Sequence, residues 1–232
     1  MHTHASCAVV GATGYVGSNL VPHLVASGWR VRAVARDISV LQAREWQDVE
    51  LATADALQPE GLVAALQGIQ VAYYLVHSMA AGRDFGKLDL QAAENFAAAA
   101  GAAGVERIVY LGGLVPAESA GEHIDSRRRT GDVLRAASVP VTEIRAGIIV
   151  GPGSAAFEVM RDLVLNLPVM VTPRWVRAKS PPIALFNLLV YLERIALLAE
   201  AAGQTYDAGG PQLCTYEDMM RQLALSAGKK PP

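Results

Sequence analysis

The feature that most constrains the fold is a glycine-rich turn that ends a short apolar run near the N-terminus. Residues 7–10 have the apolar character of a buried strand, and Gly11, Gly14 and Gly17 follow at intervals of three residues. Glycines at this spacing let the backbone turn tightly, approach a pyrophosphate closely and pack the next helix against its strand. The N–H groups at the start of that helix then face the phosphates. The sequence therefore predicts a strand, turn and helix that hold a dinucleotide.

The residues after the turn have the pattern of a helix. Val16, Leu20 and Leu24 share one helical face, and Gly28 is a suitable stop. Pro22 lies inside this helix and should kink it, at a cost of roughly 3 kcal/mol if nothing relieves it. A glycine triplet alone is a weak signal, because this chain is rich in glycine and alanine. Its position between a strand and a helix favours a nucleotide site over a chance loop.

The next strand, residues 30–37, bears on which dinucleotide is bound. In the usual fingerprint an acidic residue near the end of this strand binds the ribose hydroxyls of NAD. Here the strand ends in Arg36, and a guanidinium suits the 2′-phosphate of NADP instead. The alternative interpretation is that Arg36 only pairs with Asp37 or Glu45 at the surface. The sequence thus favours NADP over NAD.

Strand and helix patterns alternate through residue 146. The expected later strands are residues 49–55, 71–76, 107–111 and 141–146, and the expected helices are residues 59–66, 88–103 and 125–137. This alternation predicts a Rossmann-type α/β fold, a doubly wound parallel sheet with helices on both faces.

Ligands of such sheets bind at the carboxyl ends of the strands, and several candidate residues lie there. Asp55 is expected to meet the adenine amino group, to cap the helix that follows, or to do both. His77 either contacts the cofactor ribose or a substrate, or only fills a loop. The cofactor-binding residues predicted in this part of the chain are Gly11, Thr13, Gly14, Tyr15, Val16, Gly17, Arg36, Asp55, Ala56, Leu75, Val76 and His77.

The pattern changes beyond residue 150. Helical periodicity appears near residues 155–166, 183–200 and 215–227, with a proline-rich stretch between the first two. We expect a dinucleotide-binding Rossmann domain over residues 5–150. A smaller, mostly helical region over residues 151–232 is expected to close over the carboxyl edge of the sheet and shape a substrate pocket. The composition of the last five residues indicates a chain that continues past Pro232.

Charge and composition exclude several classes of partner. A net charge of −2, with no long block of like charges, offers no basic surface for nucleic acid. The most apolar late segment, residues 183–199, is interrupted by polar and charged side chains and falls short of a membrane span. Cys7 and Cys214 have no metal-ligand spacing, which indicates reduced thiols in a cytoplasmic protein. We expect no metal site, and the oligomeric state stays open, a homodimer included.

Several segments together resemble the atypical and extended short-chain dehydrogenase/reductases. They are residues 11–17, 31–37 and 104–111, with Asp55. More narrowly, residues 73–79 and 151–158 resemble NAD(P)-binding proteins of the nucleoside-diphosphate-sugar epimerase-like type. The resemblance covers nearly the whole chain. It implies a nicotinamide cofactor and a small carbonyl or sugar-like substrate.

The resemblance also implies a catalytic set, from which this sequence departs. Members of the superfamily use a serine after the fifth strand, and a tyrosine and a lysine four residues apart on the next helix. Here the serine position falls on Gly112–Gly113, the tyrosine position on His123 and the lysine position on Arg127. Arg127 keeps the positive charge that holds a cofactor ribose or phosphate. His123 either acts as an acid or base near neutral pH or merely begins the helix.

Three functions follow from these features. The first is an NADP(H)-dependent oxidoreductase of the atypical class, with the nicotinamide near His77 and Arg127 and with His123 as proton donor. The second is a non-catalytic NADP(H)-binding regulatory or assembly module, which the missing serine, tyrosine and lysine favour. The third is a sugar-nucleotide epimerase. It ranks lower because it needs the same tyrosine and usually NAD, against which Arg36 argues.

Overall fold

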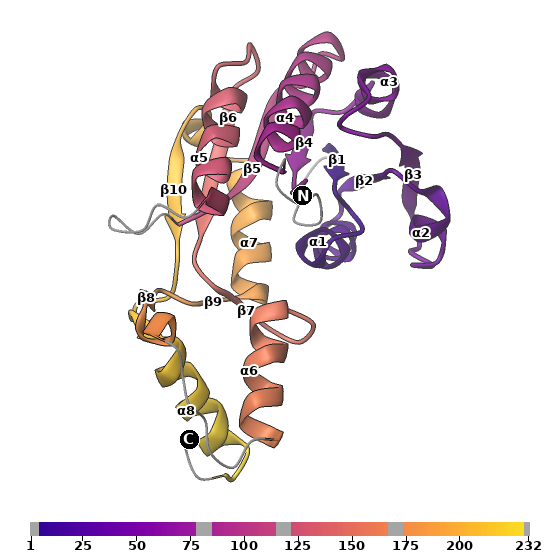
Figure 1. Cartoon of the computed structure of the whole chain (residues 1–232). Helices are drawn as coiled ribbons and strands as arrows, with labels where there is room; N and C mark the ends of the chain where they lie inside the picture. The colour runs from indigo at the N-terminus through magenta and orange to yellow at the C-terminus, as the bar shows by residue number, and fades with distance from the viewer. Residues whose placement is uncertain (1–4, 78–84, 115–121, 167–173, 230–232) are drawn as a thin grey trace. The chain divides into compact units, whose positions relative to one another are not determined.

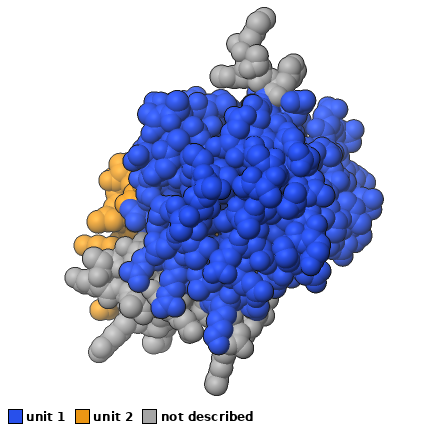
Figure 2. All heavy atoms as spheres, turned by 90° about the horizontal axis from the view of Figure 1, so that it is seen from above, with its two compact units in different colours: residues 1–145, 189–206 blue, residues 146–188, 207–232 orange. Residues whose placement is uncertain are grey.

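The computed structural model describes residues 5–77, 85–114, 122–166 and 174–229 (Figure 1). The chain forms two compact units, coloured blue and orange in Figure 2. Unit 1 consists of residues 1–145 and 189–206, and unit 2 of residues 146–188 and 207–232.

Seven strands of the described residues form one sheet, in the order β10-β6-β5-β4-β1-β2-β3. They are β1 (Ser6–Val10), β2 (Arg30–Ala35), β3 (Val49–Thr53), β4 (Val71–Tyr74), β5 (Arg107–Gly113), β6 (Val141–Ala146) and β10 (Thr205–Ala208). β2 and β4 both pair in parallel with β1, and β3 and β5 extend the parallel ladders outward. The chain therefore winds from β1 to β3 in one direction and from β4 in the other, which is the Rossmann order. The predicted doubly wound α/β fold is confirmed.

Helices pack on both faces of this sheet. They are α1 (Tyr15–Ala26), α2 (Ile38–Gln42), α3 (Leu62–Leu66) after a 3-10 turn (Pro59–Gly61), α4 (Phe85–Ala102), α5 (Glu122–Arg135) and α7 (Leu185–Ile195). Neighbouring residues of a strand point to opposite faces. On β4, the Tyr74 ring packs against Phe96 of α4 with centroids 4.7 Å apart, while the Tyr73 hydroxyl donates to the Leu192 carbonyl of α7 at 3.1 Å. α4 and α7 therefore cover opposite faces, and α5 lies beside α4 (Figure 1).

α1 continues through Pro22 as one helix from Tyr15 to Ala26. Proline removes one backbone hydrogen bond, to the carbonyl four residues earlier. Pro22 is exposed, so water can reach that side of the helix. The helix ends where expected, with Gly28 in the left-handed region at φ 85°.

Unit 2 has a small core between two helices, α6 (Ala155–Asn166) and α8 (Tyr216–Ser226), and a 3-10 turn (Arg174–Arg177). Its described residues also form two short ladders. In one, β7 (Ile149–Val150) pairs with β9 (Ile183–Ala184), and in the other, β8 (Lys179–Ser180) pairs with β11 (Cys214–Thr215). The sequence placed all residues after 150 in the smaller region. In the structure, residues 189–206 belong to unit 1, because they supply the end of α7 and the start of β10. That the smaller region shapes a substrate pocket stays a prediction.

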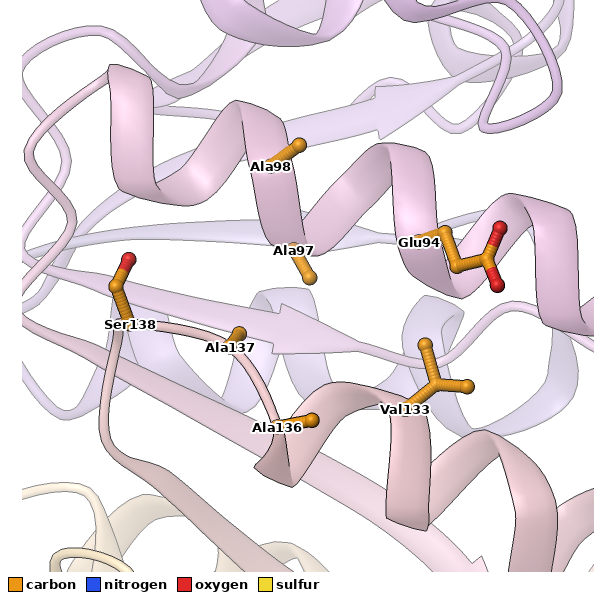
Figure 3. A pocket seen from close by; sticks show the side chains of 7 residues that line it. All are labelled: Glu94, Ala97, Ala98, Val133, Ala136, Ala137 and Ser138. Atoms are coloured by element: carbon orange, nitrogen blue, oxygen red, sulfur yellow. The ribbon is translucent and has the colours of Figure 1, made fainter.

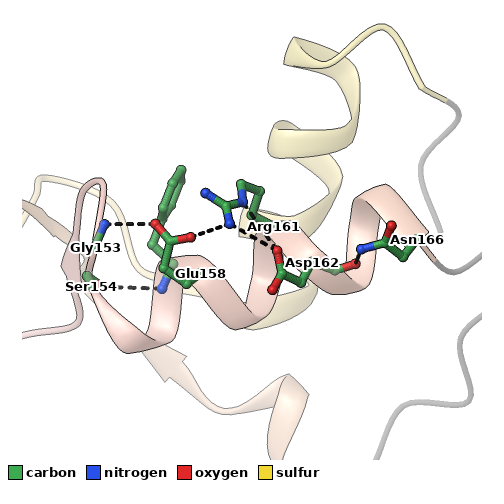
Figure 4. Close-up of polar contacts among 7 residues, drawn as sticks. Gly153, Ser154, Glu158, Arg161, Asp162 and Asn166 are labelled. Atoms are coloured by element: carbon green, nitrogen blue, oxygen red, sulfur yellow. Dashed lines mark hydrogen bonds and ion pairs between the residues drawn. The ribbon is translucent and has the colours of Figure 1, made fainter.

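Residues 151–158, which carried part of the resemblance, build the start of α6 (Figure 4). The Gly153 N–H donates to Glu158 Oε1 at 2.8 Å, and the Phe157 N–H donates to Ser154 Oγ at 3.2 Å. Glu158 also pairs with Arg161 at 2.5 Å. The Ser154 hydroxyl satisfies an N–H group that the helix start leaves open, and Glu158 ties the residue before the cap to the first turns, so the motif has a structural role in capping.

The two cysteines differ in burial, and this predicts a difference in reactivity. Cys7 on β1 is 0% exposed, and burial raises the pKa of its thiol to about 12, whereas Cys214 is half-exposed. Because the thiolate is the reactive form, a thiol reagent at pH 8 should modify Cys214 of the native protein readily and Cys7 only on unfolding. The measurement is the count of fast-reacting thiols with and without urea. Cys214→Ser should leave none in the native protein, and two fast thiols would contradict the prediction.

Candidate functional site

A cavity of about 400 Å³ in unit 1 opens at the carboxyl ends of β1, β2, β3 and β4. This volume is within the range of small-molecule sites. Nine of the residues predicted to bind cofactor line it: Gly11, Thr13, Gly14, Arg36, Asp55, Ala56, Leu75, Val76 and His77. The other predicted residues lie on helices, Tyr15, Val16 and Gly17 in the first turn of α1, and His123 and Arg127 in α5.

A second hollow of about 360 Å³ lies between α4 and α5 (Figure 3). Its walls are mainly alanine and valine side chains, with Glu94 and Ser138 as the polar members. It is more open than the first cavity and contains none of the predicted site residues. The cavity at the strand ends is therefore the candidate site.

The glycine-rich loop is held by backbone contacts that exclude side chains at two of its glycines. The Gly11 N–H donates to the Val34 carbonyl at 3.1 Å, and Gly11 has φ 93°. A Cβ at Gly11 would lie 2.9 Å from the Leu75 carbonyl, and one at Gly17 would lie 2.3 Å from the Gly11 oxygen. Both glycines are thus required by the chain itself.

Gly14 differs from these two, and the difference bears on the ligand. A Cβ there would make only ordinary contact with the chain, 3.4 Å from the Gly11 oxygen, and Gly14 has an ordinary φ of −71°. Gly14 is the N-cap of α1, lines the cavity, and has no side-chain cap among the described residues. A helix start of this kind, with room where a side chain would stand, fits the pyrophosphate of a dinucleotide.

Arg36 lies at the rim of the cavity, directly after β2. Its exposed guanidinium makes no ion pair or hydrogen bond with any residue that the structure describes. Asp37, the partner considered above, instead caps α2 by accepting from the Ser39 N–H at 2.8 Å and from its hydroxyl at 2.7 Å. These hydrogen bonds, the side-chain one first, lower the pKa of Asp37. The positive charge of Arg36 is therefore available to a ligand.

Arg44 was not predicted as part of the site. It follows α2, and its Nη2 donates to the Thr13 carbonyl of the glycine-rich loop at 3.2 Å. The two residues are 31 positions apart, so no local pattern marks the contact. A second arginine soon after Arg36 is the only signal that the sequence offers.

Asp55 stabilises the loop after β3 and does not cap the helix that follows. Its Oδ1 accepts from the Leu57 N–H at 3.0 Å, and its carbonyl accepts from the Gln58 N–H at 2.9 Å. The N-cap of the 3-10 turn is Gln58, which makes no side-chain cap. From α4, Asn95 holds the same loop by donating to the Ala56 carbonyl at 2.9 Å. Asp55 still lines the cavity, so contact with an adenine stays a prediction.

His77 is joined to a buried carboxylate. Its Nδ1 lies 2.9 Å from Oδ2 of Asp89 on α4. Ser126 on α5 donates its hydroxyl to the same oxygen at 3.1 Å. The contacts among these three residues connect the end of β4 to α4 and α5 beside the cavity. Sequence reasoning found His77 but neither of its partners.

The superfamily's serine position is occupied by charged groups from elsewhere. A Cβ at Gly113 would lie 2.9 Å from Nη1 of Arg127, and one at Gly112 would lie 2.7 Å from Oε1 of Glu143. The guanidinium of Arg127 thus lies at the carboxyl end of β5, with no hydrogen bond or ion pair to a described residue. His123 is four residues earlier on the same face of α5, and its side chain lies outside the described residues. Their catalytic roles stay predictions.

The tyrosines of the core do not replace the missing acid. Burial raises the pKa of Tyr73, Tyr74 and Tyr110, the last to about 12. The Tyr110 hydroxyl donates to the Arg127 carbonyl at 3.0 Å. A catalytic phenol needs a pKa nearer the working pH. The hydroxyls of Tyr73 and Tyr110 form structural hydrogen bonds, and none of the three tyrosines lines the cavity.

Comparison with known proteins identifies the family. The model of the NmrA-like family matches residues 3–161, more than half of the sequence. The chain belongs to the NmrA-like family. A ceramide reductase of Caulobacter vibrioides (strain NA1000 / CB15N) is 28% identical over 234 residues, which cover 97% of this chain and 71% of that protein.

Two solved structures show how widely this fold is shared. The epimerase Mth375 of Methanothermobacter thermautotrophicus superposes with a TM-score of 0.82 at 16% identity, covering 98% of this chain and 78% of its own. The triphenylmethane reductase of Citrobacter sp., solved in complex with NADP(H), has a TM-score of 0.79 at 23% identity, covering 97% and 77%. The resemblance of this NmrA-like chain to the atypical short-chain dehydrogenase/reductases is confirmed. In the part of the chain that the structure describes, no helix is long and apolar enough to cross a membrane.

Proposed function

We propose that this NmrA-like chain is an NADP(H)-dependent oxidoreductase that acts on a small carbonyl or sugar-like substrate. The observation that carries the proposal is the cavity itself, where an uncapped helix start, a glycine with room beside it and the unpaired Arg36 meet. Two similar proteins are named reductases, and one of them was solved with NADP(H).

Different residues of the chain would bind different parts of the cofactor. The glycine-rich loop and the start of α1 would hold the pyrophosphate, and Arg36 the 2′-phosphate. Asp55 and Ala56 would line the adenine side, and Leu75, Val76 and His77 the side towards the nicotinamide. Arg127 would meet the nicotinamide ribose. When bound, NADP(H) supplies or accepts a hydride.

A non-catalytic NADP(H)-binding module is the second candidate. The glycines at positions 112 and 113 favour it, because they replace the serine on which the superfamily's catalysis depends. Oxidation of NADPH in the presence of a panel of aldehydes and ketones separates the two, since a binding module does not consume the cofactor. An epimerase ranks below both, because it would need the tyrosine that position 123 lacks.

Calorimetric titration with NADPH and NADH tests the cofactor proposal. Arg36→Ala should weaken NADPH binding roughly 10- to 100-fold, because a hydrogen bond to a charged group contributes about 1.5–3 kcal/mol. NADH binding should stay unchanged, since NADH has no 2′-phosphate. Arg221→Ala, which removes the same charge from the exposed side of α8, is the matched control and should alter neither titration. Failure of the wild-type chain to bind either cofactor would refute the proposal, and equal losses for both would refute the preference for NADP.

A further inference from the structure

Among the side chains that the structure describes, the proposed function still needs a group that moves a proton. Carbonyl reduction adds a hydride to carbon and a proton to oxygen, and the core tyrosines are unsuited to supply the proton. Arg36 and Asp55 are the other ionisable side chains among the described residues that line the cavity. An arginine stays protonated and an ordinary aspartic acid stays ionised at neutral pH. His77 is therefore the lining residue whose side-chain type both gains and loses a proton in that range.

Burial of the carboxylate of Asp89, the partner of His77, costs free energy. Asp89 is 3% exposed, although the faces of α4 around it contribute alanine and Phe96 to the core. Removing a carboxylate from water costs several kcal/mol unless it is paired and hydrogen-bonded. Here Oδ2 of Asp89 lies 2.9 Å from Nδ1 of His77 and accepts from the buried hydroxyl of Ser126 at 3.1 Å.

The chemistry of this contact bears on the state of the imidazole. An ionised carboxylate only accepts hydrogen bonds, so an ionised Asp89 requires the proton between the two groups to be on Nδ1 of His77. The second ring nitrogen, Nε2, then either accepts a hydrogen bond or, in the imidazolium, donates one. Ser126 limits the rotation of the Asp89 carboxylate. The orientation of the His77 ring is therefore set by residues from the end of β4, from α4 and from α5.

We propose that Asp89 is a positioning residue that holds His77 with Nδ1 protonated, and that His77 exchanges a proton with the substrate oxygen through Nε2. The inference rests on the proposed function and gives His77 the role that the superfamily assigns to tyrosine. In a reduction, a bound reduced nicotinamide would supply the hydride to the carbonyl carbon, and the π electron pair would move to the oxygen. The imidazolium of His77 would give its Nε2 proton to that oxygen, and the neutral ring, still protonated at Nδ1, would regain the proton from water.

The first test reads the ring directly and does not depend on activity. Nitrogen-15 NMR of the full chain, with the His77 signals assigned by His77→Gln, reports which ring nitrogen carries the proton. We expect neutral His77 of the wild type to be protonated at Nδ1, and Asp89→Asn to shift this population. Glu94→Gln removes an exposed carboxylate from the same helix and should leave the spectrum unchanged. A wild-type ring protonated at Nε2, or a spectrum unaltered in Asp89→Asn, would overturn the proposal.

The second test separates positioning from a merely structural role. With NADPH and the most reactive carbonyl of the panel, Asp89→Asn should lower kcat on the order of 100-fold, the scale of general acid–base catalysis, and leave the Kd for NADPH within about threefold. Equal losses of kcat and NADPH affinity would show a structural role and overturn the inference. Ser126→Ala keeps the His77–Asp89 contact and should lower kcat severalfold, which provides a second reading if Asp89→Asn fails to fold.

The outcomes for the two proposals are distinct. A wild-type chain that binds no NADPH refutes the proposed function, while the NMR result still decides whether Asp89 sets the state of His77. A chain that binds NADPH but oxidises it with no member of the panel refutes proton transfer by His77.

Discussion

Gly17→Ala is expected to lower the free energy of unfolding by about 3 kcal/mol and to abolish dinucleotide binding. In most helix interiors this substitution stabilises by up to 1 kcal/mol. Here the new Cβ would lie 2.3 Å from the Gly11 oxygen and 2.8 Å from the Ala12 Cα, and both are backbone atoms. The start of α1 must therefore move away from the turn that it closes. Urea denaturation followed by circular dichroism measures the loss, and calorimetry with NADPH measures binding.

Gly14→Ala is the matched control for this effect. Its Cβ meets the chain at an ordinary 3.4 Å, so stability should stay within about 0.5 kcal/mol of the wild type. NADPH binding should still fall at least about tenfold, because the methyl group would enter the cavity that Gly14 lines. A Gly17→Ala protein as stable as the wild type would show that the helix start tolerates displacement. Unchanged affinity in Gly14→Ala would argue against a pyrophosphate at this position.

The sequence predicted those elements whose limits are set by local signals. α6 occupies residues 155–166 as expected, because its apolar periodicity begins just after Gly153 and Ser154. The end of α4 was equally clear, since Gly104 adopts a positive φ of 72° that other residues avoid. The doubly wound parallel sheet followed from the alternation of strands and helices, which permits few topologies.

Elements that depend on distant partners were not predicted. β10 (Thr205–Ala208) is mostly exposed and has no apolar alternation, so its membership of the sheet depends on neighbours from β6. One such contact is the hydrogen bond from the Glu143 N–H to the Gln204 carbonyl at 2.9 Å. The short ladders of unit 2 have the same origin. Their two-residue strands carry too little pattern to be recognised alone.

The same distinction between local signals and distant partners separates the site residues that were predicted from those that were not. Residues at the carboxyl ends of strands were found because topology alone places them at one edge. Asp89 was missed because the sequence of an alanine-rich helix does not show whether an acidic side chain is buried or faces water. Arg44 was missed because its partner, Thr13, is far away in sequence. The resemblance to the short-chain dehydrogenase/reductases suggested His123 and Arg127, and their roles stay predictions.

Arg135→Ala is expected to destabilise unit 1 by about 3 kcal/mol, because it leaves a buried carboxylate without its counter-ion. Glu143 on β6 is 4% exposed and forms an ion pair with Arg135 of α5. A Cβ at Gly131 would lie 3.1 Å from both carboxylate oxygens, which shows how closely the backbone encloses them. Urea denaturation measures the loss.

Asp132→Ala is the control for this pair. Asp132 also contacts Arg135, at 2.5 Å, but its side chain is 63% exposed, so its loss should cost less than about 1 kcal/mol. Replacing Glu143 by leucine in the Arg135→Ala protein should recover much of the stability, since no buried charge then remains. Failure of that rescue, or equal effects of Arg135→Ala and Asp132→Ala, would show that Glu143 is not the source of the loss.

The same pair explains why a catalytic serine is absent from the end of β5. A side chain at Gly112 would begin 2.7 Å from Oε1 of Glu143, an atom that its ion pair holds in place. The position at which other members of the superfamily carry the catalytic serine is here next to the carboxylate of a structural ion pair. A structural ion pair thus stands where a serine would be, and the proposal that His77 exchanges a proton at the end of β4, beside Asp89, does not depend on that position.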